Sequence, residues 1–147
     1  MKKYFSIPLL CCVALIASSC HSAPKERGVL TPGGFSSSAG WTREEKEVAI
    51  ARRLLKTTPE SSHFLIRLLT LEEPHVHQDH DLVVTVLKGE AEVTMGGKTY
   101  PVAKGDLIDI PRGTPHAVKN AGRGACEVYA LFTPAFEGKD HHPVESA

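Results

Sequence analysis

The stretch GDLIDIPRGTPHAVKN, residues 105–120, decides the fold of this 147-residue chain. Short apolar runs flank a turn that is rich in proline and glycine. Written as a spacing pattern, it is G-x5-P-x-G-x2-H-x3-N, with the histidine at position 116. Proline at positions 111 and 115 stiffens the loop that delivers His116. The stretch therefore predicts two short strands joined by a rigid turn.

Short strand patterns continue on both sides of this stretch. Lys-Gly and Gly-rich turn signals separate them, and Gly96-Gly97 has the form of a two-residue hairpin turn. A regular series of short strands is typical of a sandwich or a barrel. The predicted strands cover residues 64–71, 82–87, 91–95, 107–110, 117–118 and 126–132.

Histidine is the residue type that indicates chemistry in this chain. The segment EEPHVHQDHDL, residues 72–82, holds three of the eight histidines. Residues i and i+2 of an extended segment point to the same face, so His75 and His77 can converge on one point. His116 can join them from another strand. Neutral imidazoles are common ligands of first-row metals, so the three histidines predict a metal site.

The two histidine segments together resemble the motifs of the cupin superfamily. Residues 105–120 fit the second cupin motif at every spacing, and His75, His77 and Gly89 fit the first. The resemblance implies an all-β fold, a double-stranded β-helix or jelly-roll barrel. It also implies that His75, His77 and His116 hold one divalent transition metal, which can be iron, zinc, manganese, nickel or copper.

One position departs from the cupin pattern. Leu82 stands where the family usually has a glutamate ligand, and Asp81 satisfies only the shorter spacing. A regular strand would turn Leu82 towards the site and Asp81 away from it, unless a bulge intervenes. Some cupins use four histidines, which makes His80 another candidate. Two alternatives therefore stand: an open three-histidine site, which we favour, or a four-ligand site completed by His80 or Asp81.

A short helix is expected before the barrel. The sequence Thr42-Arg43-Glu44-Glu45 has the form of a capping box. Apolar residues at helical spacing follow it, and basic residues close the segment. These signals predict a helix over residues 43–56, packed on the edge of the domain.

The first twenty residues resemble a bacterial lipoprotein signal. Two lysines precede the apolar run IPLLCCVALI, residues 7–16, and small residues lead to Cys20. Position 17 is alanine, where such signals most often have leucine. We expect a signal peptide at 1–19, a lipid on Cys20, a flexible tether at 20–40 and a cupin domain at 41–147. The protein would then be exported and lipid-anchored to a bacterial cell-envelope membrane, at its periplasmic face or at the cell surface. Ordinary secretion is the alternative.

Charge and cysteine content exclude several other classes of protein. Lys plus Arg and Asp plus Glu both total 17, which argues against a nucleic-acid binder. Three of the four cysteines lie in the first twenty residues, so Cys126 cannot form part of a disulfide framework in the domain. We interpret Cys126 as a core thiol. The motifs typical of dinucleotide binding, phosphate-binding loops and serine hydrolases are absent from the sequence.

The sequence leaves two functional hypotheses. The first is a metal-dependent enzyme, dioxygenase-like or isomerase- and lyase-like, acting on an unknown small molecule; no catalytic residue stands out. The second is a non-catalytic periplasmic module that binds a small molecule or a metal. The cupin resemblance also makes a homodimer an expectation. Glu72, Glu73 and the pair His141-His142 are interpreted as solvated polar residues. The side chains expected to line the pocket are Leu65, Leu82, Val84, Val93, Ile108 and Phe132.

Overall fold

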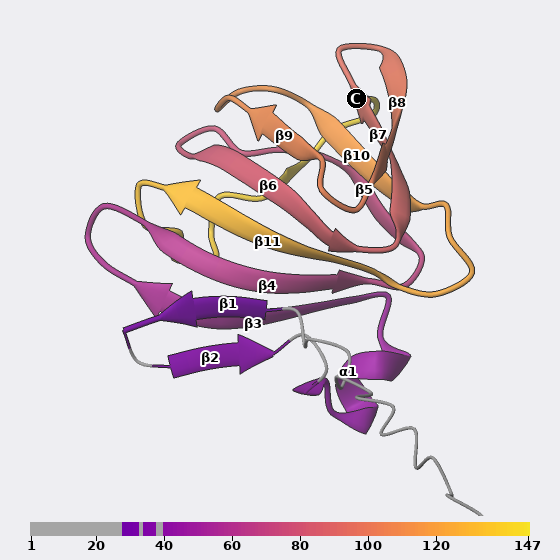
Figure 1. Ribbon diagram of the computed structural model, residues 1–147. Coiled ribbons are helices and arrows are strands. Elements are labelled where there is room, and N and C mark those ends of the chain that lie inside the picture. The colour runs from indigo at the N-terminus through magenta and orange to yellow at the C-terminus, as the bar shows by residue number, and fades with distance from the viewer. Residues whose placement is uncertain (1–27, 33, 38–39) are drawn as a thin grey trace, which may run out of the picture.

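The structure is a computed structural model that describes residues 28–32, 34–37 and 40–147. Two five-stranded antiparallel sheets pack face to face in the barrel (Figure 1), in the orders β12-β5-β10-β7-β8 and β3-β4-β11-β6-β9. The predicted all-β jelly-roll fold is confirmed. The strands are β3 (Ile50–Thr57), β4 (Ser62–Leu68), β5 (Leu71–Val76), β6 (Asp81–Lys88), β7 (Glu90–Met95), β8 (Lys98–Ala103), β9 (Leu107–Ile110), β10 (His116–Asn120), β11 (Cys126–Thr133) and β12 (His142–Pro143).

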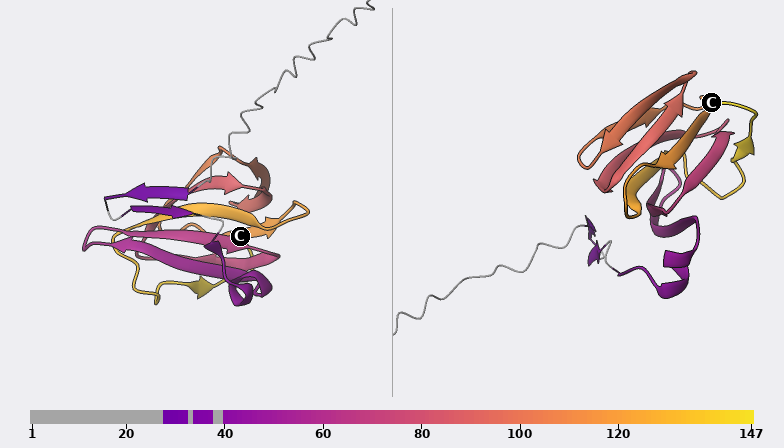
Figure 2. Two further views of the ribbon diagram at one scale, coloured as in Figure 1. Left: turned by 60° about the horizontal axis from the view of Figure 1, so that its bottom comes forward. Right: turned by 90° about the vertical axis from the view of Figure 1, so that its right-hand side faces the viewer.

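The N-terminal helix is much shorter than predicted. Helix α1 (Arg43–Glu47) begins at the expected capping box, in which Thr42 and Glu45 each accept a hydrogen bond from the other's backbone amide. The prediction of a helix to residue 56 is wrong, because Val48 already has an extended conformation and β3 begins at Ile50. Figure 2 shows α1 outside the two layers.

Strand β3 replaces the rest of the predicted helix because both of its faces have packing partners. Ala51 is buried against Trp41 and Leu65 on the outer side of the sheet, whereas Ile50 packs on the inner core. Antiparallel pairing with β4 runs from Ile50 to Thr57. A five-residue helix is marginal by itself, and the tertiary contacts of a strand outweigh a weak helical pattern.

Part of the expected tether has secondary structure. Strands β1 (Gly28–Thr31) and β2 (Gly34–Ser37) pair as a separate two-stranded sheet. Leu30 and Phe35 are exposed, so neither side chain adds to the core. The predicted signal peptide at 1–19 and Cys20 lie outside the described residues. In the part of the chain that the structure describes, no helix is long and apolar enough to cross a membrane.

The turns predicted from glycine are present, and one of them is sterically demanding. Gly96 and Gly97 both have positive φ in the hairpin between β7 and β8. Gly89 joins β6 to β7 with φ of 83°. A Cβ atom there would lie 3.0 Å from both the carbonyl oxygen of Ala125 and the Cα of Cys126. Only glycine therefore fits this connection without a backbone shift.

Candidate functional site

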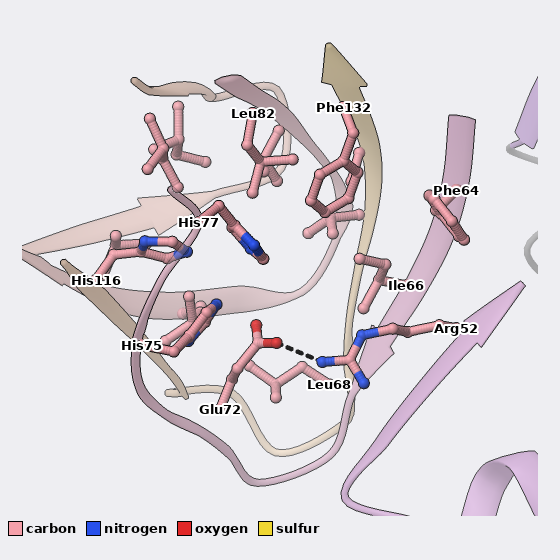
Figure 3. Close-up of a pocket in the computed structure, with 18 of the residues that line it drawn as sticks. Arg52, Phe64, Ile66, Leu68, Glu72, His75, His77, Leu82, His116 and Phe132 are labelled. Carbon is pink, nitrogen blue, oxygen red and sulfur yellow. Dashed lines mark hydrogen bonds and ion pairs between the residues drawn. The ribbon is translucent and has the colours of Figure 1, made fainter. Parts of the chain in front are cut away.

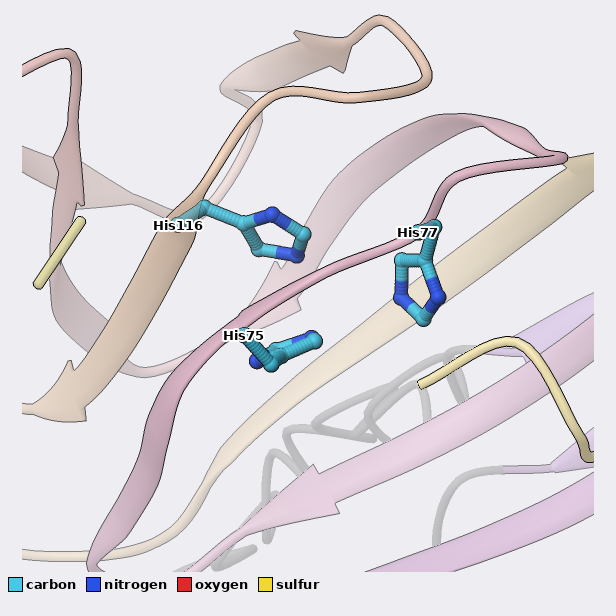
Figure 4. Close-up of side chains that lie close together, drawn as sticks. All are labelled: His75, His77 and His116. Atoms are coloured by element: carbon cyan, nitrogen blue, oxygen red, sulfur yellow. The ribbon is translucent and has the colours of Figure 1, made fainter. Parts of the chain in front are cut away.

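Three histidines from the sheet containing β5 and β10 converge inside the barrel. His75 in β5 and His116 in β10 are direct cross-strand partners, and His77 follows the end of β5 on the same face as His75. The ring centroid of His75 lies 4.2 Å from that of His116 and 5.0 Å from that of His77. One ligand nitrogen from each residue lies within 4.8 Å of the other two. Figure 4 shows the three rings around a common space.

Backbone carbonyls fix the tautomer of each ring. The Nδ1–H groups of His75 and His116 donate to the carbonyls of Glu73 at 2.8 Å and Thr114 at 2.9 Å. The Nδ1–H of His77 donates to the carbonyl of Asp140. A carbonyl oxygen only accepts, so each proton is on Nδ1 and each Nε2 keeps its lone pair. This is the arrangement that orients metal-binding histidines, and the residues therefore fit a metal ion.

The burial of the three rings keeps them neutral. Their exposed fractions are 1% for His75, 5% for His77 and 2% for His116. Burial lowers the pKa of His75 from 6.5 to about 4. Burial also lowers the pKa values of His77 and His116 below 6.5. The cluster is therefore ready to bind a cation at neutral pH without first losing protons.

The cluster lies in the wall of a cavity of about 410 Å³ between the two sheets. Most of its lining is apolar, as the close-up in Figure 3 shows. Five of the six predicted lining residues are present: Leu82, Val84, Val93, Ile108 and Phe132. Leu65 is the exception, because it faces Trp41 on the outer side of β4. Its neighbours Phe64 and Ile66 face the cavity instead, as strand alternation requires.

The candidates for a fourth ligand lie elsewhere. Leu82 lines the cavity, as a regular β6 requires, but it offers no donor atom. Asp81 is turned outward and binds Arg112 at 2.6 Å, and hydrogen bonds from Arg112 lower its pKa to about 2. His80 is buried against Asp140, with Nδ1 2.5 Å from Oδ2 and Nε2 3.1 Å from the carbonyl of Ala135. Both ring nitrogens of His80 thus face acceptors, and neither joins the cluster.

Three polar residues near the cluster were not predicted to be part of the site. Glu72 and Arg52 line the cavity and form an ion pair of 2.5 Å, and His141 stacks on His75 with ring centroids 4.0 Å apart. The position of Glu72 depends on a β-bulge, and that of Arg52 on the strand that replaced the predicted helix. His141 is carried by the segment after β11, where no periodic pattern gives a signal.

Cys126 fits the interpretation as a core thiol. It is 1% exposed and packs with Leu68, Val86 and Ala91. Burial raises the pKa of its thiol to about 11, so the reactive thiolate is scarce at neutral pH.

Comparison with known proteins gives a family match for part of the chain. The cupin domain family matches residues 70–132. An uncharacterized protein of Aquifex aeolicus is 40% identical over 91 residues, which cover 62% of this chain and 74% of that protein. The chain therefore contains a small cupin domain.

A curated enzyme and a solved structure are also similar to this chain. Quercetin 2,3-dioxygenase of Bacillus subtilis is 42% identical over 83 residues, which cover 49% of this chain and 25% of the enzyme. The match thus spans about a quarter of that enzyme's length. Among solved structures, KdgF from Halomonas sp. aligns with a TM-score of 0.58 and 25% identity, covering 60% of this chain and 82% of KdgF.

Proposed function

We propose that this cupin is a metal-dependent enzyme that acts on a small molecule, with dioxygenase-like or isomerase- and lyase-like chemistry. The observation that carries the proposal is the histidine cluster itself: three buried neutral rings, each with Nδ1–H held by a carbonyl, turn Nε2 towards one space. The cavity beside them has room for a ligand. The similarity to a quercetin 2,3-dioxygenase supports the same class.

The histidines and the apolar walls of the cavity would have different roles. His75, His77 and His116 would hold the ion. A bound divalent transition metal supplies a Lewis-acid or redox centre. The apolar walls, including Val84, Ile108 and Phe132, would bind the body of the small molecule and keep bulk water away.

A non-catalytic binding module is the second candidate. The observation in its favour is Leu82, which leaves the site without the carboxylate that the cupin motif usually carries. Such a protein would hold a metal or a small molecule for a partner without changing it.

Metal analysis of the purified full-length protein separates these functions. The enzyme hypothesis expects a stoichiometric transition metal, together with turnover in a panel that includes catechol-like and thiol substrates under oxygen. A protein that lacks metal and fails to bind added iron, zinc, manganese, nickel or copper would contradict it. Stoichiometric iron with oxygen uptake on one of these substrates would exclude the passive module.

We also propose that the protein is an exported lipoprotein that contacts the membrane through its lipid alone. We propose further that it forms a homodimer and binds no nucleic acid. The basic start, the apolar run at 7–16 and Cys20 support the export signal. Labelled fatty acid should be incorporated into the wild-type chain and not into Cys20→Ser. Sedimentation of the detergent-solubilised protein tests the dimer.

A further inference from the structure

Glu72 faces the cavity because β5 contains a β-bulge. His75 pairs with His116 and Glu72 pairs with Val118, so three steps along β5 match two steps along β10. Directly paired residues point to the same face of a sheet. Glu72 therefore lies on the same side as His75, although a regular strand would place residues three apart on opposite faces.

The carboxylate of Glu72 is held within the cavity wall. Its side chain is 17% exposed, and it is the one carboxylate among the described residues that line the cavity. Arg52 reaches it from β3 and donates from Nη2 to Oε1 at 2.5 Å (Figure 3). This ion pair offsets the cost of keeping a charge beside apolar walls.

Glu72 also lies close to one histidine of the cluster, His75. One donor atom each from Glu72, His75 and His141 lie within 4.8 Å of one another. The Nδ1–H of His75 is donated to a carbonyl, so His75 has a single lone pair to give. An ion at that lone pair belongs to the group of His75, His77 and His116. Glu72 is not in that group, so its side chain would join the ion by rotating towards it.

His141 is a poorer donor to that ion than Glu72. Its ring stacks on His75 with an interplanar angle of 14°. The lone pair of an imidazole lies in the ring plane, so an ion in the plane of His75 would lie well outside the plane of His141. The carboxylate of Glu72 has no such restriction, and its contacts with Arg52 and His141 both use Oε1. Oε2 is then the oxygen available to the ion.

We propose that Glu72 is the carboxylate ligand of the metal centre, in the place that Leu82 leaves vacant in the family motif. The inference rests on the proposed metal site. Three neutral imidazoles leave a divalent ion with its full charge inside an apolar cavity, and a carboxylate ligand would place a negative charge directly against it.

Metal titration of full-length variants tests the assignment. Glu72→Gln keeps the shape of the side chain and removes its charge, whereas Glu73→Gln removes the exposed charge next to it in β5. Competition with a chromophoric chelator should show zinc and cobalt(II) affinity weakened at least about tenfold in Glu72→Gln and unchanged in Glu73→Gln. The visible absorption spectrum of bound cobalt(II) should change shape in Glu72→Gln alone, because that spectrum reports the donor set.

Each outcome has a definite meaning. If the wild-type protein binds none of the metals, the proposed function fails. If the wild-type protein binds cobalt and Glu72→Gln matches it in affinity and spectrum, only the assignment of Glu72 fails. Weaker binding with an unchanged spectrum would also overturn it, since a remote charge acts without being a ligand. If Glu72→Gln does not unfold cooperatively in urea, Glu72→Asp replaces it; withdrawal of the carboxylate by one methylene should likewise weaken binding and alter the spectrum.

Discussion

The backbone carbonyl of Asp140 accepts the Nδ1–H of His77, and so joins the segment after β11 to the first histidine motif. The Asp140 side chain continues this connection, since its carboxylate accepts hydrogen bonds from the amides of Gln78 and Asp79 and from His80. Asp140 is 5% exposed. One residue thus holds both the loop after β5 and a candidate metal ligand.

Replacement of Asp140 by alanine should destabilise the fold and weaken metal binding. The donors of three residues, of which His80 is buried, would lose their acceptor, which predicts a loss of about 2–4 kcal/mol in the free energy of unfolding. Urea denaturation measures this loss. Lys139→Ala, at an exposed neighbouring position, is the control and should change stability by less than about 0.5 kcal/mol. Equal stability of the two variants would contradict the anchoring role.

Single alanine substitutions in the cluster should remove metal binding. His75→Ala and His116→Ala should each lower affinity by more than about 100-fold, because each deletes one of three ligand nitrogens. Elemental analysis after dialysis gives the occupancy. His63→Ala is the control, since His63 binds the Tyr129 hydroxyl away from the cluster. Full occupancy in either cluster variant would refute the ligand assignment.

Introduction of the family's glutamate at position 82 should make stability depend on metal. Leu82 is buried with Ile110, Ala130 and Phe132, so Leu82→Glu should cost the metal-free protein about 2–4 kcal/mol. A bound ion should recover part of this loss, because the new carboxylate would face it. Thermal unfolding with and without zinc provides the comparison. Leu107→Glu, at an exposed position of β9, should show neither effect; the same loss with and without zinc in Leu82→Glu would show that position 82 does not face the ion.

The stability of the metal-free protein should fall as the pH is lowered from 6.5 towards 4. Burial lowers the pKa of His75 to about 4, so between these values the unfolded chain binds a proton that the native chain does not. Protons then favour the unfolded state, with a slope of up to about 1.4 kcal/mol per pH unit for each such group. Urea denaturation at several pH values should show a smaller slope for His75→Asn. An identical slope would indicate that other groups cause the pH dependence.

Replacement of Gly89 by alanine should separate two costs of a side chain. The positive φ and the contacts of a Cβ atom with residues 125 and 126 together predict a loss of about 2–4 kcal/mol. Gly97 also has positive φ, but nothing lies within 4 Å of its Cβ position. Gly97→Ala should therefore lose only about 1 kcal/mol in the same unfolding assay. Equal losses would mean that the crowding at Gly89 relaxes freely.

Much of the barrel could be predicted because its turns depend on local chemistry. Glycine pairs and the Pro111-to-Gly113 turn mark connections that few other residues allow, and alternation within the strands then gives the inward face. The prediction of a helix was wrong over segment 50–57 because the apolar residues there suit either a helix or a strand. The choice depends on Trp41 and on pairing with β4, neither of which is visible in a local pattern.

The histidine cluster could be predicted because it also depends on local sequence patterns. The positions of Glu72 and His141 beside it could not be predicted in this way. His75 and His77 share a face by simple alternation, and His116 follows a rigid turn. Glu72 lies beside them only because of the extra residue in the bulge. His141 depends on Asp140, whose partners lie far away in the sequence.

The contact between His77 and Asp140 also sets an order of events during synthesis. Ribosomes make a chain from its N-terminus, and residue 140 is therefore made after every barrel strand from β3 to β11. Until that residue arrives, His77 lacks the carbonyl that fixes its proton. The arrangement of all three rings is therefore complete only after residue 140 has been made and the segment after β11 has packed against the first histidine motif.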